Sequence, residues 1–204
     1  MFSSTLAFVN TLAYGSDMKP RLTSDDWIFA GFRALVDTGP QALKAEPLAR
    51  SLGTTKGSFY WHFKDVPDFH AQMLTVWENH AYHAVTQALA TIRDPATRLQ
   101  KLGSLAVGDD QTQSKAWGGP GAEPAIRAWA QANPMVAVAT RKIDALRIGY
   151  ISDILTELDL PDPDLPRIIY AAYIGLGTLS AGDGIANETA MEKVITALLT
   201  QPEN

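Results

Sequence analysis

One short stretch of the chain, residues 48–65 with the sequence LARSLGTTKGSFYWHFKD, gathers hydroxyl, basic and aromatic side chains. On a helix over residues 56–63, Phe59 and Phe63 lie four positions apart and can pack together on the preceding helix. The opposite face is then small, polar and aromatic, so it can donate hydrogen bonds to phosphate oxygens and base edges. We expect this nucleic-acid-binding face to consist of Thr54, Thr55, Lys56, Gly57, Ser58, Tyr60, Trp61, His62 and Lys64.

Helix signals on both sides predict the elements that hold this face. Thr23 and the acidic residues that follow it form a helix start, and Gly39 with Pro40 ends that helix. A second, short helix begins near Ala45 and ends at Gly53, and Thr55 caps the next. These short segments, joined by a tight turn, indicate a helix-turn-helix. Asp65 then caps a long helix that reaches about residue 92.

The rest of the chain also has helical patterns and almost no strand alternation. We expect helices over about 95–108, 123–132, 134–158, 164–181 and 188–200, separated by loops rich in glycine and proline. The predicted fold class is all-α. It comprises a dispensable leader over 1–17, a three-helix helix-turn-helix DNA-binding domain over 18–65, and a helical effector-binding and dimerisation domain over 66–204.

The charge of the chain is divided unevenly between these parts. The whole chain carries a net charge of -5, but residues 18–65 carry +2 and residues 66–204 carry -6. The excess of positive charge therefore lies where the helix-turn-helix is predicted, as expected for a segment that faces phosphates. The chain contains no cysteine, which excludes disulfides, thiolate metal sites and cysteine nucleophiles. Apolar runs are too short for a membrane span, and the leader lacks the positive start of an export signal, so we expect a soluble, cytoplasmic protein.

Residues 22–70 resemble the DNA-binding domain of TetR-family transcriptional regulators, on the strength of the segments LARSLG and TTKGSFYWHFKD followed by a long helix. The resemblance implies DNA contacts from Thr55, Lys56, Ser58, Tyr60, Trp61, His62 and Lys64, and packing roles for Phe59 and Phe63. It also implies a repressor that a small, largely apolar effector releases from a near-palindromic operator in double-stranded DNA. The last two helices, within about 164–200, would then form a homodimer interface.

The predicted effector-binding domain is rich in aromatic residues, which commonly line ligand pockets. The residues we favour for an effector pocket are Trp117, Trp129, Tyr150 and Tyr173; the alternative for each of them, taken singly, is ordinary core.

We expect no catalytic residues, metal or cofactor. His80 and His83 lie three residues apart on one predicted helix but lack a third ligand. The pair Gly175 and Gly177 follows no strand, which argues against a dinucleotide fingerprint. The alternative function is a small helical enzyme or ligand carrier without DNA binding. The residues available to such an enzyme, including Ser104 and Asp109, have no spacing that links them.

Overall fold

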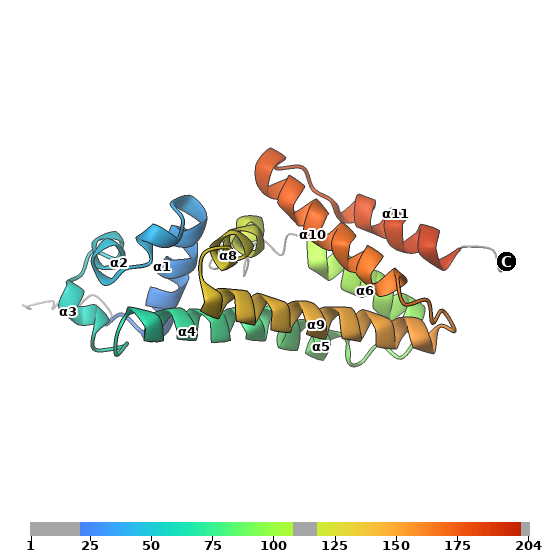
Figure 1. Ribbon diagram of the computed structural model, residues 1–204, viewed down its shortest axis with the longest axis horizontal. Helices are drawn as coiled ribbons and strands as arrows, with labels where there is room; N and C mark the ends of the chain where they lie inside the picture. Colours follow the sequence, from blue (N-terminus) through green and yellow to red (C-terminus); the bar gives the residue numbers. More distant parts are fainter. Residues whose placement is uncertain (1–20, 108–117, 201–204) are drawn as a thin grey trace, which may run out of the picture.

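The structure is a computed structural model that describes residues 21–107 and 118–200. Within those ranges every regular element is helical, as predicted (Figure 1). The expected leader over 1–17 and Trp117, which we favoured for an effector pocket, lie outside the described residues.

The amino-terminal helices begin where their capping residues predict. Helix α1 (Ser24–Asp37) starts after Thr23, whose hydroxyl accepts the backbone N–H of Asp26 at 3.3 Å while the Asp26 carboxylate accepts the Thr23 N–H at 2.7 Å. This reciprocal pair satisfies backbone donors that the first turn of a helix leaves free. The turn η1 (Pro40–Ala42) and the short helices α2 (Ala45–Ser51) and α3 (Lys56–Phe59) follow.

The long fourth helix of the prediction is one continuous run with a local irregularity. It consists of α4 (Val66–Glu78), the π-helical turn η2 (Asn79–His83) and α5 (Ala84–Leu89). The Asp65 carboxylate caps its start by accepting the Asp68 N–H at 2.8 Å. The run ends at Leu89, a few residues before the predicted end. The sequence pattern does not predict the π-helical turn, in which a backbone N–H bonds the carbonyl five residues earlier instead of four.

The remaining helices agree with the predicted ranges to within a few residues. They are α6 (Pro95–Val107), α8 (Ala122–Ala130) after the turn η4 (Gly119–Gly121), α9 (Pro134–Glu157), α10 (Leu165–Asp183) and α11 (Glu188–Leu199). In Figure 1 helices α4 and α9 run along the length of the molecule. The helices α1 to α3 lie at one end, and α6, α10 and α11 lie toward the other.

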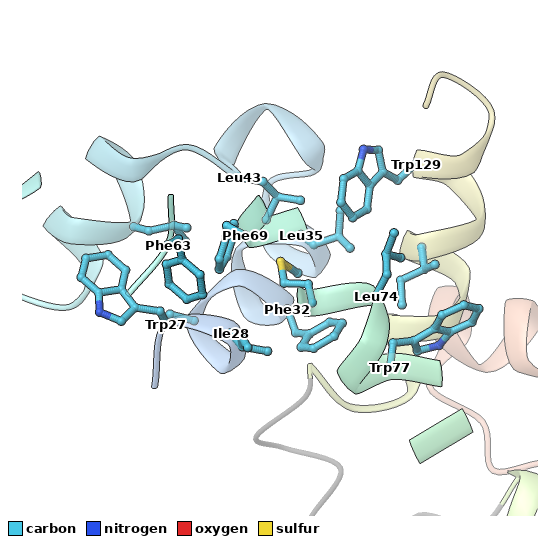
Figure 2. Packing of buried hydrophobic residues seen from close by; sticks show 14 of the residues in the cluster. Trp27, Ile28, Phe32, Leu35, Leu43, Phe63, Phe69, Leu74, Trp77 and Trp129 are labelled. Carbon is cyan, nitrogen blue, oxygen red and sulfur yellow. The ribbon is translucent and has the colours of Figure 1, made fainter. Parts of the chain in front are cut away.

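Two separate hydrophobic cores stabilise this arrangement. The first core joins α1, α2, α3, α4, α8 and the first half of α9, and Figure 2 shows its side chains reaching from Trp27 and Phe63 to Trp77 and Trp129. The second core joins α6, the second half of α9, α10 and α11. The helix-turn-helix therefore shares its core with α4, α8 and part of α9. A movement of these helices must be transmitted to it, because packed cores resist local deformation.

His70 on α4 joins the helix-turn-helix to the body of the molecule. Its Nε2 donates to the Leu43 carbonyl at 3.1 Å, since a carbonyl can only accept, and its ring lies edge-on to Trp129 with 4.9 Å between centroids. Burial lowers the pKa of His70 below its ordinary value of 6.5, although the bond to Leu43 opposes this shift.

Acidification is therefore expected to lower the free energy of unfolding, in part through His70. The unfolded chain takes up the proton at a higher pH than the folded chain, so the contribution is complete above about pH 6.5 and is lost as the pH falls toward the lowered pKa. Urea unfolding at about pH 7.5 and about pH 5.5 measures the effect. His70→Gln should lose less stability between the two values than the wild type. His83→Gln, at an exposed position, is the control that should keep the wild-type difference, and an unchanged pH dependence in His70→Gln would contradict the assignment.

No helix within 21–107 or 118–200 is both long enough and apolar enough to cross a lipid bilayer.

Candidate nucleic-acid interface and ligand cavity

The predicted nucleic-acid-binding face is held by a helix shorter than the sequence pattern indicates. Helix α3 spans only Lys56–Phe59, whereas we expected a helix over 56–63. The chain continues in tight turns, in which Trp61 N–H donates to Ser58 O at 3.3 Å and His62 N–H donates to Phe59 O at 3.0 Å. Because these bonds span three residues instead of four, the segment tightens and leaves regular helical geometry.

A buried group of rings supports this face from below. Phe59 is fully buried and lies 5.4 Å from Trp27, 4.9 Å from Phe63 and 5.3 Å from Phe69 between ring centroids. Most of these pairs have tilted or edge-on geometry, which aromatic rings prefer. The prediction that Phe59 and Phe63 pack inward is confirmed. The rings join α3 to α1 and α4, so they position whatever α3 presents to solvent.

The opposite side of the segment presents polar and aromatic groups to solvent. Trp61 is 80% exposed and Tyr60 is 48% exposed, while its ring leans edge-on against Phe59 at 5.2 Å. Of the other residues predicted for the face, Thr55, Lys56, Gly57 and Lys64 are exposed, and Thr54, Ser58 and His62 are half-buried. Six of the nine predicted residues are thus exposed and three are half-buried.

Three local features shape the approach to this face. Gly53 adopts a positive φ of 64°, a conformation that costs an L-residue energy, and it closes the turn between α2 and α3. The Thr55 hydroxyl accepts the Ser58 N–H at 3.3 Å and thereby caps α3. A side chain added at Gly57 would meet only the Thr55 hydroxyl, at 3.7 Å. This part of the surface is consequently open to close approach by a partner.

A cavity of about 470 Å³ lies between the two hydrophobic cores. Phe32 and Trp77 of the first core line one side, and residues of the second core, including Leu99 and Ile169, line the other. The π-helical turn η2 contributes Ala81 and Tyr82 to the lining. The volume is within the range of pockets that bind small molecules, and the lining is largely apolar and aromatic.

One wall of the cavity is polar. Glu123, Arg127, Asp144, Arg147 and Tyr170 form a closed hydrogen-bonded group, which we call the ion cluster. Arg147 donates to both oxygens of Glu123, at 3.0 and 3.3 Å, and Arg127 donates to both oxygens of Asp144, at 2.6 and 3.3 Å. The Tyr170 hydroxyl donates to Asp144 at 2.7 Å and accepts from both arginines. All of these residues except Asp144 line the cavity.

The ion cluster also reaches the long fourth helix. The Trp77 indole N–H on α4 donates to Glu123 at 3.2 Å. The Arg147 Nε donates to the Ala81 carbonyl in η2 at 3.1 Å. The polar wall of the cavity thus contacts the same helix that packs against the helix-turn-helix.

The ionisation of the ion cluster is stabilised by its internal partners. Burial acts against the charges of Arg127 and Arg147, but the facing carboxylates and tyrosines outweigh it and raise the pKa of both arginines. Burial likewise opposes the charge of Asp144, yet the bonds from Arg127 and Tyr170 lower its pKa. Burial raises the pKa of Tyr173 to about 12. Arg127, Arg147 and Asp144 are therefore charged at neutral pH, and Tyr170 and Tyr173 are neutral.

The residues predicted for an effector pocket are only partly together. Tyr150 and Tyr173 line the cavity. Trp129 does not line it and instead lies in the first core, edge-on to His70. The ion cluster was not predicted from the sequence. Its signal is the spacing of Glu123 and Arg127, and of Asp144 and Arg147, which places each pair on one face of a predicted helix.

Among the described residues, no group of three or more histidines, aspartates or glutamates is arranged to hold a metal ion. His80 lines the cavity, whereas His83 does not.

Comparison with known proteins connects this geometry to one family. No family model and no curated protein sequence matches the chain. Solved structures do match. A TetR-family transcriptional regulator from Rhodococcus sp. has 17% identity and a TM-score of 0.73, with 87% of this chain and 98% of that chain covered. A TetR-family transcriptional regulator from Streptomyces coelicolor has 14% identity and a TM-score of 0.70, with 87% and 89% covered.

A third match is a transcriptional regulator from Saccharomonospora viridis in complex with choline, with 17% identity, a TM-score of 0.67, and 86% and 94% of the two chains covered. All three proteins are described as transcriptional regulators. Structural neighbours across most of the chain are thus TetR-family regulators. The chain has the all-helical fold of TetR-family transcriptional regulators.

Proposed function

We propose that this protein is a DNA-binding transcriptional regulator, and specifically a repressor that a small, largely apolar effector releases from its operator. The observation that carries the DNA-binding part is the exposed face around Trp61, which stands on a buried ring cluster at the end of the molecule. An exposed tryptophan flanked by tyrosine, histidine and lysine has no packing role, but it can contact sugars, phosphates and base edges. In this proposal residues 18–65 bind DNA, and residues 66–204 bind the effector and form the dimer.

The effector site in this proposal is the cavity between the two cores. It has room for a small molecule, and apolar and aromatic side chains supply most of its lining. The complex of the Saccharomonospora viridis regulator with choline supports small-molecule binding by this fold. An effector in the cavity would touch Trp77 and Ala81, and therefore the helix that carries the helix-turn-helix.

Homodimerisation through about 164–200 is supported by the outward face of α10. Ile168, Ala171, Gly175 and Leu179 follow one another at helical spacing, and all four are exposed. A stripe of apolar and small residues of this kind suits close packing with a second copy, and two-fold dimers are the commonest assemblies. Two recognition segments about 34–36 Å apart, or a multiple of this, would face a near-palindromic operator. We infer that the protein acts in the cytoplasm.

The regulatory mechanism we propose is a shift between two populations of the dimer. Effector binding would favour a position of the α4 helix in which the two recognition segments no longer match the operator spacing. A coupling free energy of about 1–3 kcal/mol reduces DNA affinity about 5- to 150-fold, which is sufficient for release.

DNA binding is tested by selecting duplexes from a random-sequence pool with the full chain. The selected duplex and a scrambled control are then titrated at about 50 mM and about 200 mM salt. We expect preferential binding of the selected duplex that weakens steeply with salt, because binding to phosphates releases counterions. Failure to enrich any duplex, or enrichment without salt dependence, would eliminate this function.

Point substitutions separate the roles within the face. Tyr60→Ala and Lys64→Ala should weaken binding to all duplexes, and Lys64→Ala should reduce the salt slope by about one unit. Thr55→Ala and Lys56→Ala should change which sequences are selected. Lys101→Ala, an exposed lysine on α6, is the matched control and should bind like the wild type. If Tyr60→Ala binds normally, the placement of the face is wrong.

A further inference from the structure

The polar wall of the cavity has no net charge and no charged group without an opposite partner. Glu123 and Asp144 supply two negative charges, and Arg127 and Arg147 supply two positive charges. Arg127 contacts both carboxylates, because its Nε and one terminal nitrogen also donate to Glu123 at 3.1 and 2.9 Å. The side chain of Arg147 is only 14% exposed and that of Arg127 only 23% exposed, so solvent screens these charges weakly.

We propose that this cavity accepts an uncharged ligand and excludes ions, and that Glu123 is the residue that determines this selectivity. The inference rests on the proposed function only in taking the cavity as the ligand site. It concerns which ligand charge the cavity accepts, and the lining residues of this chain set that selectivity.

An anionic ligand is disfavoured because both guanidinium groups are already engaged. To reach Arg147, a carboxylate would have to displace Glu123 from a two-point contact. Glu123 would also lose the Trp77 indole if it moved away. The displaced carboxylate would remain in the wall without a cation, and a buried charge without a partner is costly.

A cationic ligand is disfavoured because the aromatic faces nearest the polar wall already face cations. The Arg147 guanidinium lies 5.2 Å from the centroid of the Tyr173 ring, and the Arg127 guanidinium lies 6.0 Å from that of Tyr170. A ligand cation at either ring would meet a like charge at short range. Glu188 also lines the cavity, but it is an exposed residue at the start of α11, where solvent screens its charge.

An uncharged ligand leaves every one of these contacts intact. The rest of the lining offers it an apolar surface that includes Leu102, Ile151, Ile174 and Met191. Burial lowers the pKa of His80 below its ordinary value of 6.5, which disfavours a positive charge on this lining residue. The ligand class is therefore an uncharged molecule with a predominantly apolar body.

Glu123 controls the charge balance because, among the described residues, it is the carboxylate that contacts both arginines and also lines the cavity. Glu123→Gln keeps a carbonyl acceptor of the same size but removes the negative charge. The wall then carries one uncompensated positive charge beside the cavity. A ligand carboxylate can pair with it and regain the lost stabilisation.

The test compares three probes with the same alkyl chain: octan-1-ol, octanoate and octyltrimethylammonium. Each is titrated into the full-length protein by isothermal calorimetry at about pH 7.5. We expect octan-1-ol to bind at least about tenfold more tightly than either ion. Equal or tighter binding of an ion, or no binding of octan-1-ol, overturns the proposal.

The same three titrations with variants test the role of Glu123. In Glu123→Gln the ratio of octanoate to octan-1-ol affinity should rise at least about tenfold. Glu157→Gln, which removes a carboxylate paired with Arg98 outside the cavity lining, should keep the wild-type order. Asp144→Asn removes a charge from the same cluster behind the cavity lining and, if Glu123→Gln does not fold, tests whether the charge balance of the cluster sets the ligand selectivity. An unchanged ratio of octanoate to octan-1-ol affinity in folded Glu123→Gln overturns the role of Glu123. DNA binding is measured separately, so loss of the regulator function would not be confused with loss of ligand selectivity.

Discussion

Phe59→Ala is expected to lower the free energy of unfolding by about 3–5 kcal/mol, whereas Trp61→Ala is expected to change it by less than about 0.5 kcal/mol. The two aromatic residues are two positions apart, but Phe59 is fully buried and Trp61 is 80% exposed. Truncation of Phe59 leaves a cavity between Trp27, Phe63 and Phe69. Truncation of Trp61 removes only surface. Urea unfolding at one fixed protein concentration measures both effects.

DNA binding should not follow the loss of stability in Trp61→Ala. Trp61→Ala is expected to weaken binding to the selected duplex about tenfold while the protein remains as stable as the wild type. If Trp61→Ala binds DNA with wild-type affinity, the exposed ring has no role in the interface. Equal destabilisation by the two substitutions would show instead that Trp61 packs against part of the protein.

Arg147→Met is expected to lower the free energy of unfolding by about 3 kcal/mol. The substitution keeps most of the apolar side chain but removes the donors to Glu123, Tyr170 and the Ala81 carbonyl. We place the effect at the lower end for a broken buried ion pair, because Glu123 retains its contact with Arg127. The link from α9 to the π-helical turn is lost at the same time.

Lys142→Met is the matched control for this prediction. Lys142 is on the same helix and pairs with Glu78 on α4, but more than half of its side chain is exposed. An exposed pair contributes little, so this substitution should cost less than about 1 kcal/mol. If urea unfolding shows equal losses for the two variants, the ion cluster does not stabilise the fold beyond an ordinary surface pair.

Features that depend on neighbouring residues in the chain could be predicted from the sequence. Thr23 and Asp65 cap α1 and α4 as expected, because a cap needs only a side-chain oxygen near the next three backbone N–H groups. The inward positions of Phe59 and Phe63 follow from helical spacing in the same way. Even here the local pattern has limits, since the helix ends at Phe59 and Phe63 lies beyond it, after the tight turns.

Features that depend on several helices could not be predicted. The ion cluster draws on α8, α9 and α10 and reaches α4 and η2, and no spacing in the sequence indicates that these helices converge. Trp129 and Tyr173 are both aromatic residues on helices, yet one is part of the first core and the other lines the cavity. The rotation of each helix about its axis decides such outcomes, and packing sets that rotation.

The sequence by itself determined the approximate positions of the helices and the caps of α1, α3 and α4, because each is specified within one or two turns of chain. The tertiary structure decided that the body divides into two cores, that a cavity lies between them, and that four charges neutralise one another in its wall. The physical reason is that the burial and pairing of charges depend on which distant helices come into contact. The spacing of residues within one helix does not indicate that contact.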